Sequence, residues 1–306
     1  MGKLSRYFFV AFIILSACIP AQPGSKQNPG SLNILTAESF LADITRNIAG
    51  NRAQVDSLIP EGMDPHAFEL TPQDIVRITE CDVFILNGGG LEGWAQSVLK
   101  NIQPGQLVLE ASQGLAPRLP EAGTEVGHES ESDPHFWLDP VLVIHYVENI
   151  RNGLIQVDSA GESEYTANAE NYIKQLKDLD AWIQSQIDQI PVETKLLVTN
   201  HESFGYFADR YGFKIVGTII PSVSTGVSPS ARQLADLINH IRETKAPAIF
   251  IETGANPQLA IQVEAETGAK VVTGLNTHSI QSTNGQESSY IAMMKWNVTE
   301  IVNALK

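Results

Sequence analysis

Residues 159–190 form one unusually long amphipathic pattern, and this pattern constrains the fold more than any other feature of the chain. Apolar residues recur at three- and four-residue intervals with polar residues between them, as on one face of a helix. We expect Ser159 and Glu162 to form a capping box, and Pro191 follows the last turn. Such a helix is long for a globular protein. It predicts a connector between two similar lobes, with one helix among many in a single α/β domain as the alternative.

Short strands alternate with helices on both sides of this segment. In residues 32–158 we expect strands at 32–36, 54–59, 82–86 and 106–109, and helices at 39–49, 71–80, 91–102 and 140–157. In residues 191–306 we expect strands at 195–199, 214–219, 248–252 and 270–273, and helices at 202–210, 229–243, 257–266 and 288–305. This alternation predicts an α/β fold of two (β/α) lobes with parallel sheets, whose ligands bind outside the carboxyl ends of the strands.

The N-terminus has the layout of a secretory signal. Lys3 and Arg6 precede an apolar run that is too short to span a bilayer, and the run ends in Leu-Ser-Ala-Cys at residues 15–18. This ending resembles a bacterial lipobox, which implies cleavage before Cys18 and its lipidation; an ordinary signal with an incidental cysteine is the alternative. We therefore expect a signal peptide at 1–17 and a flexible lipidated tether at 18–31, rich in Pro, Gly, Gln, Asn and Ser. The protein would be secreted and held on the outer face of the cytoplasmic membrane, at the cell surface or in the periplasm.

Charge and cysteine content exclude two classes of protein. The 306 residues carry a formal net charge of −15, whereas nucleic-acid-binding proteins are usually basic, so we expect no nucleic-acid partner. Apart from Cys18 the chain has one cysteine, Cys81, so no internal disulfide framework is possible once Cys18 is lipidated. Cys81 is expected to be a buried small apolar residue.

Three histidines follow predicted strands and form a candidate metal site. The tripeptide Asp-Pro-His occurs twice, ending at His66 and His135, and each proline stiffens the loop that presents the imidazole. His201 follows the strand expected at 195–199. Three imidazoles at the carboxyl ends of strands predict a transition-metal site. A single loop histidine is more often solvated, so it is the repeated motif that favours a site.

Other polar residues are weaker candidates. Glu252 ends a strand and is considered as a fourth ligand, as an acceptor for an imidazole N–H, or as a helix-cap carboxylate. His278 lies in a loop beyond the last strand and could reach the cleft, but a solvated loop residue is the favoured interpretation, while His145 and His240 fall within helices. The glycine-rich run at 87–93 lacks the phosphate-loop ending and predicts a tight strand-to-helix turn. No familiar catalytic motif is present.

Five segments resemble the solute-binding lipoproteins of bacterial zinc and manganese ABC importers. They are GMDPH at 62–66, NGGGLEGW at 87–94, DPHFWLDP at 133–140, NHESFGYF at 200–207 and YIAMMKWN at 290–297. They occur in the family's order and span nearly the whole chain after the tether. The resemblance implies two (β/α) lobes joined by one rigid long helix, one metal ion between the lobes, and His66, His135 and His201 as its ligands.

The chain departs from this family at two places. Family members often carry an aspartate ligand after the last strand, where this sequence has Thr273-Gly274. The fourth position is therefore open to Glu252, His278 or water. Zinc-specific members often have a histidine-rich loop before the second Asp-Pro-His, whereas here the loop at 125–133 is acidic with only His128, and we expect it to be a mobile surface loop.

These observations predict a lipid-anchored, monomeric receptor outside the cytoplasm. It would capture a divalent transition metal, zinc with manganese as the alternative, and deliver it to an ABC permease and its ATPase subunit. Three neutral imidazoles suit tetrahedral zinc, whereas manganese prefers oxygen ligands. Two other classes are alternatives: a zinc-dependent hydrolase with Glu202 or Glu252 as base, and a surface adhesin with a structural metal.

Overall fold

A computed structural model describes residues 31–100, 102–118, 132–280 and 289–306, and the statements below concern these residues. The predicted signal peptide, Cys18, nearly all of the tether, and the loop residue His128 lie outside them. Within the described part of the chain, none of the helices is long and apolar enough to cross a membrane.

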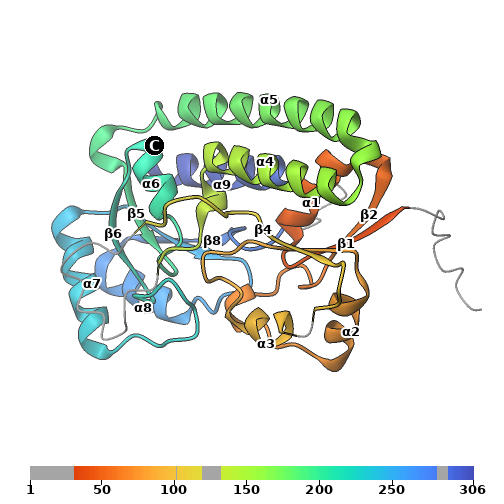
Figure 1. Ribbon diagram of the computed structural model, residues 1–306. Helices are drawn as coiled ribbons and strands as arrows, with labels where there is room; N and C mark the ends of the chain where they lie inside the picture. Colours follow the sequence, from red (N-terminus) through yellow and green to blue (C-terminus); the bar gives the residue numbers. More distant parts are fainter. Residues whose placement is uncertain (1–30, 101, 119–131, 281–288) are drawn as a thin grey trace, which may run out of the picture. The chain divides into compact units, whose positions relative to one another are not determined.

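The N-terminal lobe contains a parallel four-stranded sheet of order β2-β1-β3-β4 (Figure 1). Its strands are β1 (Leu32–Thr36), β2 (Ala53–Ser57), β3 (Val83–Leu86) and β4 (Leu107–Glu110). Its helices are α1 (Ser39–Ala49), α2 (Pro72–Glu80), α3 (Gln96–Leu99) and α4 (Pro140–Val157). Every residue of β3 is buried, as expected of a central parallel strand covered on both faces.

The C-terminal lobe repeats this arrangement in a second parallel sheet of order β6-β5-β7-β8. Its strands are β5 (Leu196–Thr199), β6 (Lys214–Thr218), β7 (Ala248–Glu252) and β8 (Lys270–Leu275). Its helices are α6 (Gly205–Tyr211), α7 (Ala231–Thr244), α8 (Gln258–Thr267) and α9 (Tyr290–Leu305). In both sheets the first strand of the lobe lies between the second and the third. Ligands bind at such a reversal of strand order, outside the carboxyl ends.

The long helix is confirmed as α5 (Glu162–Ile187), and it passes over α4 and α9 in Figure 1. It packs against α1 and α4 of the first lobe and α9 of the second. The predicted capping box is wrong: Ser159 lies in a short 3-10 turn, and no side chain caps the helix at Gly161. A cap contributes about 1 kcal/mol, whereas burial of one large apolar side chain contributes roughly 1.5–3 kcal/mol. Seven buried residues of α5 therefore fix the helix without a cap.

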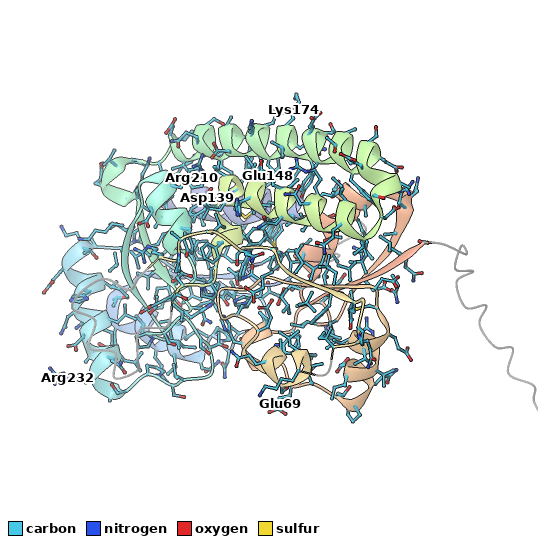
Figure 2. All side chains as sticks on the ribbon, in the orientation of Figure 1. Glu69, Asp139, Glu148, Lys174, Arg210 and Arg232 are labelled. Carbon is cyan, nitrogen blue, oxygen red and sulfur yellow. The ribbon has the colours of Figure 1, made fainter. Side chains whose placement is uncertain are left out.

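An arginine joins the two lobes beneath this helix. Arg210 of α6 forms two 2.7 Å hydrogen bonds with the carboxylate of Asp180 on α5. Its Nε also lies 3.2 Å from Asp139, which caps the start of α4 in the first lobe (Figure 2). The guanidinium of Arg210 thus links the second lobe to the connecting helix and to the first lobe.

Most predicted elements are confirmed within a few residues, with two larger differences. The helix expected at 91–102 is reduced to a 3-10 turn and the four-residue α3. The helix expected from residue 202 begins at Gly205, so His201 lies in the turn before it. The glycine-rich run is the expected tight turn, since Gly88, Gly89 and Gly90 all have positive φ. Cys81 is buried, as predicted.

Candidate metal centre

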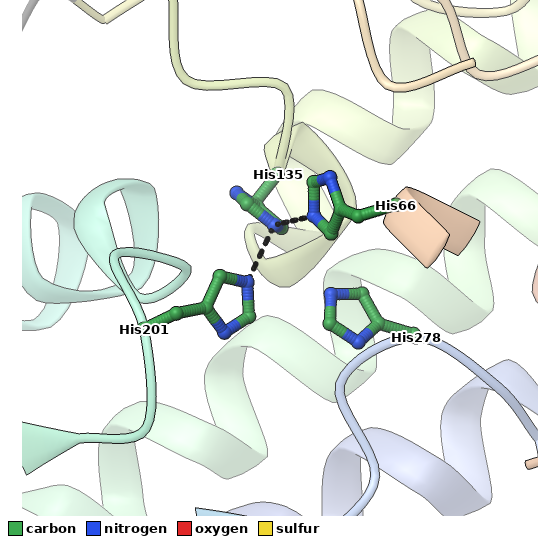
Figure 3. Close-up of side chains that lie close together, drawn as sticks. All are labelled: His66, His135, His201 and His278. Atoms are coloured by element: carbon green, nitrogen blue, oxygen red, sulfur yellow. Dashed lines mark hydrogen bonds between the residues drawn. The ribbon is translucent and has the colours of Figure 1, made fainter. Parts of the chain in front are cut away.

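Four imidazoles from the two lobes meet at one point (Figure 3). His66 follows β2 and His135 precedes α4, while His201 follows β5 and His278 follows β8. The ligand nitrogens of all four lie within 4.8 Å of one another. Nε2 of His135 is 3.3 Å from Nε2 of His66 and 3.1 Å from Nε2 of His201.

Both Asp-Pro-His segments present their histidine through the same local hydrogen bond. Asp64 Oδ1 accepts from the backbone N–H of His66, and Asp133 Oδ1 accepts from that of His135, each at 2.9 Å. The intervening proline has a fixed φ and no N–H of its own, so the aspartate oxygen is free to bond the next residue. The sequence thus encodes the turn, and the turn directs the imidazole.

Carboxylates lie beside the outer nitrogens of three rings. Asp133 Oδ1 lies 2.8 Å from Nδ1 of His135, and Glu252 Oε1 lies 2.7 Å from Nδ1 of His201. The other oxygen of Glu252 lies 3.5 Å from Nδ1 of His278. A proton on Nδ1 that faces a carboxylate leaves Nε2 as the lone-pair donor. Figure 3 shows these Nε2 atoms turned toward the common centre.

Burial keeps most of this site in the form that binds metal. It lowers the pKa of His66 to about 4 and holds the pKa of His135 and of His278 well below the ordinary value, with the neighbouring imidazoles acting in the same direction. For His278, the charge of Glu252 opposes this effect without overcoming it. These three rings are therefore neutral near pH 7, and a metal ion need not displace a proton from them.

His201 and the two carboxylates titrate differently. Burial alone would lower the pKa of His201, but the negative charge of Glu252, whose Oε1 lies 2.7 Å from Nδ1, outweighs it, and the pKa is raised. Burial would raise the pKa of Glu252, but His201 and His278 outweigh it, and the pKa is lowered. Burial raises the pKa of Asp133 to about 7. The pair His201–Glu252 thus favours the protonated imidazole and the ionised carboxylate, and a bound cation would oppose protonation of His201.

Two of the nitrogen separations in this group, and the charge around it, match those expected for a tetrahedral divalent ion. Zinc–nitrogen bonds of 2.0–2.1 Å place two ligand nitrogens about 3.3–3.4 Å apart in a tetrahedron. The two Nε2 separations of 3.1 and 3.3 Å are close to this value. Four neutral imidazoles add no charge, so the carboxylates of Asp133 and Glu252 would balance the 2+ charge of one ion.

The structure brings together the three predicted histidines and adds a fourth. The expectation that His278 is a solvated loop residue is wrong, since it is 8% exposed. Its loop is fixed by the indole N–H of Trp137, which donates to the carbonyl of Thr277. The strand before it, β8, extends two residues further than predicted. The same strand-end rule that selected His201 could therefore have selected His278.

The remaining candidates lie outside the converging group. Glu252 contacts two of its histidines, but its oxygens are not among the four ligand atoms found in the described residues, and direct ligation by Glu252 stays a prediction. His145 lies in α4, where its ring contacts the carbonyl of Gln113, and His240 is exposed on α7.

Paired α/β lobes on one connecting helix, with imidazoles from both lobes directed at one point, define a metal-binding protein of the two-lobed receptor class. Residues 34–304 match the family described as ZnuA, zinc-uptake complex component A, periplasmic, and the chain belongs to this family. It is a substrate-binding protein of a metal ABC importer. The resemblance and the fold inferred from the sequence motifs are thereby confirmed.

Named relatives differ in the metal that their names give. The chain is 33% identical to the manganese-binding lipoprotein MntA of Halalkalibacterium halodurans and 32% identical to the manganese ABC transporter substrate-binding lipoprotein PsaA of Streptococcus pneumoniae, covering all of this chain and 99% of each relative. The periplasmic zinc binding protein TroA from Treponema pallidum superposes with a TM-score of 0.80 at 28% identity, over 90% of this chain and 99% of that one. An Mn-bound periplasmic metal binding protein from Candidatus Liberibacter asiaticus also gives 0.80, at 26% identity, over 90% of this chain and all of that one.

Proposed function

We propose that the protein captures one divalent transition-metal ion, zinc in the first place, through Nε2 of His66, His135, His201 and His278. One observation carries this proposal: four imidazole nitrogens from both lobes lie within 4.8 Å of one another. In this role Glu252 is not itself a ligand. Its two oxygens orient His201 and His278, as outer carboxylates do for metal-bound histidines.

The choice of zinc rests on the donor atoms. Four nitrogens suit a borderline-soft ion, and nitrogen sites bind zinc more tightly than manganese. Manganese is the second candidate, because MntA and PsaA are named for it. It would need an oxygen ligand, and rotation of the Glu252 carboxylate toward the centre is the nearest source.

Competition titration of the purified protein with both metals tests this choice. We expect zinc to bind at least about a hundredfold more tightly than manganese. His278→Ala should weaken zinc binding strongly, and Glu252→Gln should weaken it by roughly 10–100-fold. Manganese binding as tight as zinc, with His278→Ala unchanged and Glu252→Gln inactive, would instead assign the fourth position to Glu252.

The site favours transport over catalysis. Catalytic zinc usually keeps three protein ligands and one open position for water, whereas four imidazoles fill a tetrahedral shell. We therefore infer that the protein is not a zinc-dependent hydrolase. Assay of the zinc-loaded protein with ester and phosphoester substrates should show no turnover above free zinc, and measurable turnover that depends on Glu202 or Glu252 would contradict this.

Delivery requires partners at the membrane. We propose that the lobes at 32–158 and 191–306, with the connector at 159–190, act as a monomeric receptor for a permease and its ATPase subunit. Lipidation of Cys18 would hold the receptor on the outer face of the cytoplasmic membrane. Expression of Cys18→Ala should release the mature protein from the membrane fraction, and unchanged membrane association would exclude this anchor.

A further inference from the structure

A segment of the first lobe, Pro60–Asp64, lies against the second lobe beside the histidine group. The backbone N–H of Gly62 donates a 2.9 Å hydrogen bond to Oγ of Ser279. The hydroxyl of Thr225 donates to Oδ2 of Asp64. The carbonyl of Gly62 also approaches Gly254 so closely that a Cβ there would lie 3.2 Å from its oxygen.

These contacts reach three separate loops of the second lobe. Thr225 follows β6, Gly254 follows β7 and Ser279 follows β8. The segment therefore bridges the carboxyl ends of three C-lobe strands, which is the edge that also carries His201 and His278. The hydroxyls of Thr225 and Ser279 make the two hydrogen bonds, and neither residue is a proposed metal ligand.

Asp64 connects one of these contacts to the site. Its Oδ1 accepts from the backbone N–H of His66, and its Oδ2 accepts from Thr225. One carboxylate therefore both shapes the turn that presents His66 and ties that turn to the opposite lobe. Any displacement of the Thr225 loop acts on His66 through Asp64.

The His66 ring depends on this connection more than the other rings do. His135 and His201 each have a carboxylate within 2.8 Å of Nδ1. Among the described residues, no carboxylate makes such a contact with the ring of His66, which is partly exposed. The position of His66 is thus set by its backbone turn and by what holds that turn in place.

We propose that Thr225 and Ser279 are positioning residues that form a latch between the lobes, which keeps His66 on the bound ion and limits the rate of metal release. The inference rests on the proposed metal-binding function. A cavity of about 460 Å³ borders both the latch and the site, since Asp64, Thr225 and Ser279 line it together with Glu252 and His278. The latch therefore stands where an ion would leave.

Stopped-flow transfer of zinc from the loaded protein to an excess of chelator tests the latch. Thr225→Val keeps the shape of the side chain and removes the hydroxyl, and Ser279→Ala removes the other donor-acceptor group. We expect Thr225→Val to release zinc at least about tenfold faster, because its hydrogen bond is made to a charged group. Ser279→Ala should have a smaller effect in the same direction, and the melting temperature of the metal-free variants should fall by only a few degrees.

Two controls separate a latch from a general loosening of the loop. Thr225→Ser retains the hydroxyl and should release zinc at nearly the wild-type rate. Ser228→Ala changes a residue that lines the same cavity but makes no hydrogen bond to Pro60–Asp64 within the described residues, and it should also behave as wild type.

The outcomes distinguish this proposal from the function on which it rests. Wild-type release rates in both Thr225→Val and Ser279→Ala, with zinc still bound, would overturn the latch and leave the metal-binding function standing. Release by Thr225→Ser as fast as by Thr225→Val would also overturn it. Failure of the wild-type protein to bind either zinc or manganese would instead refute the proposed function, and the latch with it.

Discussion

The two Asp-Pro-His segments have the same sequence and the same first hydrogen bond, yet their aspartates are used differently. In the second segment Asp133 contacts its own histidine ring, with 2.8 Å between Oδ1 and Nδ1. In the first segment the second oxygen of Asp64 accepts from Thr225 of the other lobe. An identical tripeptide therefore directs its aspartate side chain to its own histidine in one place and to a hydroxyl of the other lobe in the other.

The surroundings of the second segment explain the difference. The carbonyl of Pro134 accepts from the side chain of Asn87, and the carbonyl of Asp133 accepts from the hydroxyl of Tyr206. His135 is fully buried and lies against Trp137. Contacts on all sides fix the second segment, whereas the first is partly exposed. We infer that His135 is the fixed ligand and His66 the exchangeable one.

The largest expected effect is on thermal stability. A ligand that binds only the folded state stabilises it by about 4 kcal/mol at a thousandfold excess over its dissociation constant. His135→Ala should remove nearly all of the zinc-induced rise in melting temperature, and His66→Ala should leave part of it. Scanning calorimetry with zinc and with chelator measures the difference. His240→Ala, on the exposed surface of α7, should keep the full shift, and equal losses in all three variants would exclude a site at these histidines.

Substitution of Asp133 should mainly lower zinc affinity, whereas substitution of Asp64 should mainly raise the rate of zinc release. Asp133→Asn removes the charge that faces Nδ1 of His135, and zinc affinity should fall by roughly 10–100-fold. Asp64→Asn retains an oxygen for the backbone N–H of His66, so equilibrium affinity should change little while release becomes faster. Titration and stopped-flow release on the same two variants provide the comparison. Equal affinity losses would mean that the two segments do not differ as proposed.

Acid should weaken zinc binding, and both Asp133 of the second segment and His201 should contribute to this loss. The pKa of Asp133 is raised to about 7 in the metal-free protein, and that of His201 is raised above its ordinary value. A bound cation favours the deprotonated forms, so binding releases protons, and zinc affinity should fall as the pH drops from about 8 to 6. Asp133→Asn should reduce this dependence, and the part that remains should come from His201. An affinity that is flat over this range in the wild type would contradict the assignment.

Deprotonation of Asp133 has opposite effects on zinc binding and on folding. It strengthens zinc binding but destabilises the metal-free protein. The folded pKa of Asp133 lies above the unfolded value, so the folded state holds the extra proton between about pH 4 and 7. Its contribution therefore makes the metal-free protein less stable as the pH rises through this window. Urea unfolding of wild type and Asp133→Asn at several pH values measures this contribution, which should vanish in the variant.

The smallest expected effect is on overall dimensions. The unbroken α5 and the contacts of Arg210 with Asp180 and Asp139 restrict wide opening, which normally needs a loop hinge. If exchange is confined to the His66 segment, solution scattering should give nearly the same radius of gyration with and without zinc. A large compaction on binding would show that the lobes move as bodies, and the contrast between the segments would then be secondary.

The sequence alone determined the features that depend on residues close together in the chain. The apolar period of residues 159–190 predicted α5, since its buried face follows from helical spacing. The two Asp-Pro-His segments predicted stiff turns that present His66 and His135, and both turns are present. Histidines at strand ends predicted the side of the sheets on which the site lies.

Tertiary structure alone decided how distant residues combine. His278 lies 212 positions after His66 in the chain, and its nitrogen joins the group because the register of β8 and the packing of Trp137 against the following loop bring it there. The same packing places Glu252 beside the rings of His201 and His278, and it brings the hydroxyl of Thr225 within hydrogen-bonding distance of Asp64. Local hydrogen bonds and helical periodicity depend only on residues that are close together in the chain. Convergence at an inter-lobe centre depends on how two sheets and a connecting helix pack, and no single segment contains that information.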